Sequence, residues 1–83
     1  MKNLNEVNQA ITNNNLIKFS YGGADRVVEG YTVVNGLLSA YQVSCSDPNK
    51  PAGWRSFRVN QMRNLQVQSA TFSPRETGTK NKS

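Results

Sequence analysis

The sequence predicts a mainly β domain, in which an N-terminal helix caps a small, strongly bent sheet of five strands that closes toward a barrel. Three observations predict this fold. A chain of 83 residues has room for one core only. Apolar residues at helical spacing are confined to residues 2–14. Five short strand patterns follow between residues 16 and 67, and an open sheet this small would leave exposed edges and little core.

Residues 2–14 are expected to form a short amphipathic helix. The Asn3 side chain should cap the first turn, with Glu6 three residues later as in a capping box. Asn13 to Asn15 should end the helix, because asparagine tolerates left-handed backbone geometry. A helix this short must dock its apolar face on the sheet. That face carries Leu4, Val7, Ala10 and Ile11.

The first predicted hairpin comes directly after the helix. Apolar and polar residues alternate along residues 16–21, as in a half-buried strand. Residues 22–25 are the predicted turn, since they begin with two glycines that supply positive φ. The second strand, at residues 26–34, is interrupted by Gly30, where a bulge or sharp bend is expected.

The remaining strands follow a second hairpin signal. Asn35-Gly36 is a strong two-residue turn pattern, and it precedes a third strand at residues 37–45. A loop rich in Pro, Asp and Gly then leads to a fourth strand at residues 54–59. A helical turn at residues 60–62 and a last strand at 65–67 complete the domain. We expect one domain over residues 1–72 and a flexible polar tail over 73–83.

The composition argues against an enzyme. The sequence has no histidine and one cysteine, Cys45, which excludes His-dependent nucleophiles, His-ligated metal sites and an internal disulfide. Its acidic residues are scattered, so no paired-carboxylate site is expected. We therefore expect no catalytic residues, no metal and no cofactor. Without a secretory pattern or long apolar run, a cytoplasmic protein with no membrane partner is expected.

The distribution of charge points to a polyanion. The formal net charge is +5, and the segment from Pro48 to Arg75 contains no acid. Cations neutralise phosphates and aromatic rings stack on bases, so this combination favours single-stranded nucleic acid. A solvated basic face with a buried Phe57 and a half-buried Trp54 is the alternative. The cations of this segment are Lys50, Arg55, Arg58, Arg63 and Arg75, with Trp54, Phe57 and Tyr41 among them or on the neighbouring strand.

Arg55 is expected on the same strand face as Phe57 and Val59, because alternate residues of a strand share a face. An unpaired guanidinium cannot lie in so small a core. Arg55 therefore either emerges at the mouth of the barrel, as part of a ligand site, or pairs with an acid, for which Glu29 is the candidate.

Several segments together resemble the WYL domain. They are Arg26-Val27-Val28-Glu29-Gly30, then the segment from Asn35 to Tyr41, then Arg55-x-Phe57-Arg58-Val59 with Met62. The resemblance covers about residues 4–75. The tripeptide that names the family is absent, the proline that usually follows the Arg-x-x-Glu segment is Gly30, and the family's Asp-Arg pair is Asn60-Gln61.

This resemblance implies an SH3-like or Sm-like barrel with a preceding helix, and a regulatory module that binds single-stranded nucleic acid or a nucleotide. Such a module would act alone, as a homo-oligomer or on a protein partner. The alternative is a small protein-interaction adaptor of phage or mobile-element origin. Arg55 and Arg58 match the family's basic stretch, and Ser39 and Tyr41 lie on its named strand. The expected nucleic-acid or anion-binding residues are Arg55, Arg58, Arg26, Tyr41, Ser39, Trp54 and Arg63.

Overall fold

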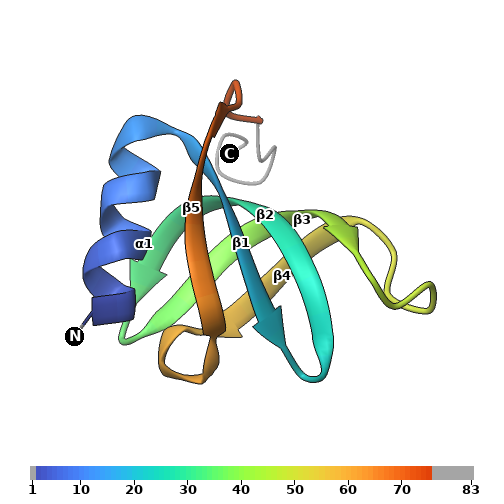
Figure 1. Ribbon diagram of the computed structural model, residues 1–83. Helices are drawn as coiled ribbons and strands as arrows, with labels where there is room; N and C mark the ends of the chain where they lie inside the picture. Colours follow the sequence, from blue (N-terminus) through green and yellow to red (C-terminus); the bar gives the residue numbers. More distant parts are fainter. Residues whose placement is uncertain (1, 76–83) are drawn as a thin grey trace.

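The computed structural model describes residues 2–75, which form one helix and one antiparallel sheet (Figure 1). The strands are arranged in the order β4-β3-β2-β1-β5, so consecutive strands from β1 to β4 are neighbours and β5 returns to the side of β1. The elements are α1 (Lys2–Asn13), β1 (Asn15–Tyr21), β2 (Ala24–Val34), β3 (Leu37–Cys45), β4 (Gly53–Arg58), the 3-10 turn η1 (Val59–Gln61) and β5 (Arg63–Thr71).

Both predicted hairpin turns are confirmed. Gly22 and Gly23 have φ of 59° and 82°, and Asn35 and Gly36 have φ of 53° and 77°. Positive φ at both central residues matches the right-handed twist of the flanking strands. The first turn is shorter than predicted, because Tyr21 already pairs with Ala24.

The helix ends where the asparagines predicted, and Asn14 has a left-handed φ of 56°. The capping role predicted for Asn3 is not seen. The helix begins at Lys2, and the Asn3 amide Nδ2 instead donates to the carbonyl oxygens of Val59 and Met62, at 3.3 and 3.1 Å. Asn3 therefore ties the start of α1 to the turn between β4 and β5.

The sheet is strongly curved around a single core. In Figure 1, β1 and β5 cross in front of β3 and β4. Phe19 on β1 contacts Phe57 on β4, with ring centroids 5.1 Å apart, although two strands separate β1 from β4 in the sheet. The core between these layers also receives the apolar face of α1. Its buried members are Val7, Ala10, Ile17, Phe19, Val28, Leu38, Ala40, Phe57, Val59 and Met62.

The predicted closure into a barrel is not confirmed. Within residues 2–75, β4 and β5 are the two edges of the sheet and do not pair with each other. The SH3-like or Sm-like type of barrel is therefore not confirmed either. The structure does confirm the predicted mainly β fold, with one helix over a bent five-stranded sheet. Strand β5 is much longer than predicted, since residues 68–71, three of which are polar, gave no alternating pattern.

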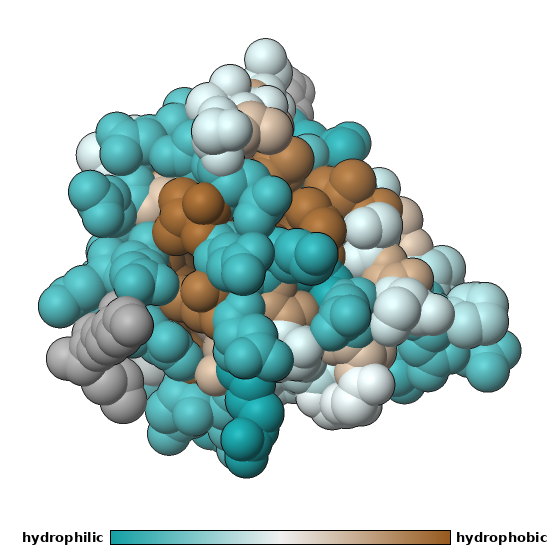
Figure 2. All heavy atoms as spheres, in the orientation of Figure 1, coloured by the Kyte–Doolittle hydropathy of each residue, from teal (hydrophilic) through white to brown (hydrophobic). Residues whose placement is uncertain are grey.

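The bulge expected at Gly30 is present as a register shift between Gly30 and Thr32. The face that carries α1 and β5 is mostly hydrophilic, with separate apolar patches (Figure 2). Across the described part of the chain, α1 is the one α-helix, and it is too short and too polar to cross a membrane. Of the predicted flexible tail, residues 76–83 lie outside the described residues.

Candidate functional site

The two faces of the sheet divide the predicted site residues. Ala40 pairs with Arg55, and Ala40 is fully buried, so Arg55 lies on the inner face with the core. Tyr41 pairs with Trp54 on the outer face, where Trp54 is 47% exposed. Arg58 alternates with Phe57 and is exposed on that outer face. Arg55 and Arg58 therefore do not converge on one site.

Four predicted residues share the outer face of β3 and β4, and we call them the outer platform: Ser39, Tyr41, Trp54 and Arg58. The Trp54 ring meets the Tyr41 ring edge-on, with centroids 5.4 Å apart. Ser39 and Arg58 are exposed at the end of the platform nearest the Asn35-Gly36 turn. Trp54 and Arg58 are separated along β4 by the Ser56 position, about 13 Å at the usual rise of a strand. An exposed ring and an exposed guanidinium on one strand face can contact a base and a phosphate of the same single strand.

Arg26 is buried on the inner face and is only 6% exposed. Its Nε donates to the Tyr21 carbonyl at 3.1 Å, and its Nη1 donates to Gln42 Oε1 at 3.0 Å. The guanidinium carbon also lies 5.6 and 5.5 Å from the ring centroids of Tyr21 and Phe57. Polar acceptors and ring faces rather than a carboxylate compensate this charge.

Arg55 belongs to the same inner network. Its Nη2 donates to the Pro51 carbonyl at 2.9 Å, and Gln42 Nε2 donates to that oxygen at 3.0 Å. Its Nε is buried and, within residues 2–75, has no partner. The predicted pairing of Arg55 with Glu29 is wrong, because Glu29 pairs with another residue. Arg55 is partly exposed, and the loop before β4 holds its guanidinium. We call Arg26, Gln42 and Arg55 the inner arginine cluster.

Glu29 lies on the outer face, opposite Tyr41, and its partner is Arg75. Arg75 Nε lies 2.7 Å from Glu29 Oε1 and Nη2 lies 3.2 Å from Oε2, an arrangement in which both nitrogens donate. The Arg75 guanidinium carbon is 3.8 Å from the Tyr41 ring centroid. The sequence predicts that residues 73–75 belong to the flexible tail. In the structure, Arg75 is instead anchored on the sheet by these contacts with Glu29 and Tyr41.

Tyr31 completes this group. Its hydroxyl donates to Glu29 Oε1 at 2.8 Å and accepts the backbone N–H of Arg75 at 3.0 Å. Burial raises the pKa of Tyr31, and the neighbouring Glu29 carboxylate raises it further. The hydrogen bond to Glu29 likewise raises the pKa of Arg75. In the sequence, the signal for this site was an acidic residue, Glu29, in the middle of a strand. No spacing rule identified Arg75 as its partner.

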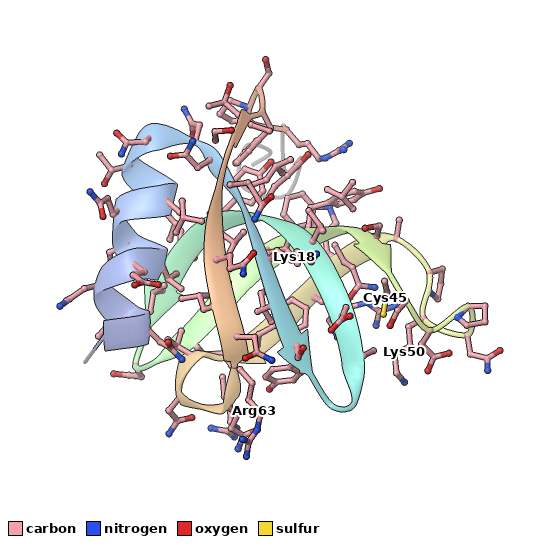
Figure 3. The ribbon with its side chains drawn as sticks, in the orientation of Figure 1. Lys18, Cys45, Lys50 and Arg63 are labelled. Carbon is pink, nitrogen blue, oxygen red and sulfur yellow. The ribbon has the colours of Figure 1, made fainter. Side chains whose placement is uncertain are left out.

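Arg63 is separate from both groups. Figure 3 shows it beside the η1 turn, pointing away from the sheet, while Lys50 and Cys45 lie toward the loop between β3 and β4. Cys45 is free and partly buried at the end of β3. Among residues 2–75, no group of His, Cys, Asp and Glu side chains could hold a metal ion.

A protein-family model described as the WYL domain matches residues 2–67 of the chain. This match runs from α1 through β4 and η1 into β5, so it includes every residue of the outer platform and of the inner arginine cluster. No curated protein and no solved structure matches the chain.

Proposed function

The chain belongs to the WYL domain family, a family of ligand-binding and regulatory domains. We propose that it is a non-catalytic module that binds single-stranded nucleic acid on the outer platform. The observation that carries this proposal is the half-exposed Trp54 ring, fixed against Tyr41 on the same strand face as the exposed Arg58. An accessible aromatic ring held in place by its neighbours is the kind of surface on which a nucleic-acid base stacks.

The outer platform is preferred over the inner arginine cluster because its groups are accessible. Bases require a flat ring that solvent can reach, and Trp54 supplies one. In the inner cluster, Arg26 is nearly inaccessible and its donors are engaged by Tyr21 and Gln42. The two clusters lie on opposite faces of the sheet, so a binding experiment can separate them.

The test is a titration with a labelled single-stranded oligonucleotide of about 12 nucleotides, at low and moderate salt. We expect Trp54→Ala to weaken binding by about 1–3 kcal/mol, while Trp54→Phe keeps most of the affinity. Arg58→Ala should weaken binding and lower the slope of log K against log salt by about 1. Parallel titrations with RNA, DNA and adenosine monophosphate distinguish the kinds of ligand.

Arg63→Ala is the matched control, since it removes one exposed arginine outside the platform. It should affect binding less than Arg58→Ala does. The proposal is wrong if no oligonucleotide binds at low salt. It is also wrong if Arg63→Ala and Arg58→Ala are equivalent and Trp54→Ala has no effect, because net charge alone would then explain the binding.

A further inference from the structure

The Glu29 carboxylate is buried on the outer face, where its side chain is only 7% exposed. It accepts hydrogen bonds from the Tyr31 hydroxyl and from two nitrogens of Arg75. A buried carboxylate that lacks a cation is strongly unfavourable. This position of the sheet therefore requires a cation whenever the protein is folded and Glu29 is charged.

The surroundings of Glu29 select arginine rather than lysine. Nε and Nη2 of the guanidinium reach the two carboxylate oxygens separately, which a single ammonium group cannot do. The planar group also lies 3.8 Å above the Tyr41 ring. The Tyr31 hydroxyl accepts the backbone N–H of the same arginine, so the main chain of the bound residue is recognised as well.

The segment from Phe72 to Arg75 is attached at its two ends. The Phe72 ring packs 5.6 Å from the Tyr31 ring, and its N–H donates to the Asn14 carbonyl at 3.0 Å. Residues 72–75 have no regular secondary structure, and the Arg75 side chain is 44% exposed. Arg75 can therefore leave Glu29 without opening the core.

From this geometry we infer that Glu29, Tyr31 and Tyr41 form a receptor for an arginine-bearing segment of a partner protein, and that Arg75 is its resident occupant. The partner segment carries an aromatic residue three positions before the arginine, as Phe72 precedes Arg75. Arg75 competes at a high effective concentration because it belongs to the same chain. Tyr41 belongs both to this receptor and to the outer platform. The inference nevertheless does not depend on nucleic-acid binding, because it is argued from the contacts of Arg75 with Glu29 and Tyr31, which are not part of the platform.

The experiment uses the full chain with Arg75→Ala and an acetylated, amidated peptide of sequence Phe-Ser-Pro-Arg. Trp54 is the only tryptophan of the sequence. Its ring centroid lies 5.4 Å from that of Tyr41 and 5.2 Å from that of Tyr31, so its fluorescence reports on the site. We expect saturable binding that is weaker by about tenfold or more when the peptide arginine is replaced by lysine or by uncharged citrulline. The wild-type chain should bind the peptide more weakly than Arg75→Ala.

Glu29→Gln in the Arg75→Ala background should abolish the response. The inference is overturned if folded Arg75→Ala gives no saturable response up to about 10 mM peptide, a concentration typical of intramolecular competition. Equal binding of the arginine, lysine and citrulline peptides overturns it as well. If Arg75→Ala does not fold, the wild-type chain decides: a saturable, arginine-specific shift of the Trp54 indole N–H resonance supports the receptor, and its absence overturns it.

Discussion

At Gly30 an added methyl group would make closer contacts with the core than side chains usually make. A Cβ at this position would lie 3.2 Å from Ile17 Cδ1, 3.3 Å from Ile11 Cγ1 and 3.4 Å from Leu38 Cδ1. We expect Gly30→Ala to lower the free energy of unfolding by about 1–3 kcal/mol, because inserting a methyl group into a packed core forces its neighbours apart. Urea denaturation at neutral pH measures the change.

A double mutant tests the cause of this loss. Ile17→Val removes the Cδ1 atom that would lie nearest to the added methyl group. Its own cost is about 0.5–1.5 kcal/mol. Gly30→Ala combined with Ile17→Val should therefore be less destabilised than the sum of the two single variants. Simple additivity would mean that contact with Ile17 is not the reason Gly30 must be glycine.

We expect Arg26 to stabilise the fold and not to bind the ligand. Arg26→Met keeps the length of the side chain but leaves Gln42 Oε1 and the Tyr21 carbonyl without this donor. We expect a loss of about 1–3 kcal/mol in unfolding free energy. Oligonucleotide affinity, measured on the folded variant, should not change. A loss of affinity with unchanged stability would instead place the ligand on the inner face.

The orientation of single side chains was predictable where it followed from strand alternation. Arg55 shares a face with Phe57, as the sequence predicted. The same alternation puts Trp54 and Arg58 on the other face. The partner of Glu29 was not predictable, since Arg75 reaches it only through the fold of the whole sheet. Local periodicity specifies the face of a residue but not its distant contacts.

The side-chain amide of Asn3 attaches helix α1 to η1 by donating hydrogen bonds, and a single substitution can remove this donor. Asn3→Asp replaces the amide that donates to Val59 and Met62 by a carboxylate that cannot donate. We expect thermal unfolding to show a loss of about 1–3 kcal/mol, because both carbonyl oxygens lose the Asn3 donor and face a negative charge, while the Val59 carbonyl keeps only the Met62 N–H.

Asn5→Asp is the matched control, since Asn5 lies in the same helix and is exposed. It introduces the same charge near the N-terminus of α1, where the helix dipole favours it by about 0.3–1 kcal/mol. Equal destabilisation by the two variants would show that charge, rather than the contact with η1, is responsible.

The elements that the sequence predicted most accurately are those bounded by turn residues. The third strand, between Asn35-Gly36 and the Pro-rich loop, was predicted with its exact ends, Leu37–Cys45. Strand β5 was predicted too short, because an edge strand with no buried face in its second half needs no apolar alternation. Pairing with β1 determines its length.

The stability of the molecule should be insensitive to pH near neutrality and should fall in alkaline solution. Burial raises the pKa of Tyr31, and the hydrogen bond to Glu29 raises the pKa of Arg75. A group with a raised pKa holds its proton more tightly in the folded state, so its contribution is complete below the unfolded pKa, about 10 for tyrosine. It is lost as pH rises through the raised value. Urea unfolding between about pH 8 and 11.5 measures this profile.

Tyr31→Phe isolates the tyrosine contribution. The variant loses the hydrogen bonds to Glu29 and Arg75, so its stability at neutral pH will differ from that of the wild type. The relevant quantity is the slope of the unfolding free energy against pH. Above about pH 10 this slope should be shallower for the variant than for the wild-type chain. An identical slope in both chains would show that Tyr31 is not the group that titrates.

A mainly β domain with a covering helix was predictable, because helical and strand periodicities occupy separate parts of the chain. The open sheet was not, since closure depends on the distance between β4 and β5. These strands are joined by the η1 turn, which leads the chain from one edge of the sheet to the other. The length and geometry of this turn leave no mark in the hydrophobic pattern.

The strand order also implies a sequence of events during folding. Strands β1 to β4 pair with their neighbours along the chain, so their contacts close short loops, whereas β5 must return to β1 across the whole meander. Contacts between distant parts of a chain carry the larger entropic cost. We therefore expect the backbone amides of the β1–β2–β3 ladders to gain protection first during refolding. The junction of β5 with β1, together with the link from Asn3 to η1, should form last.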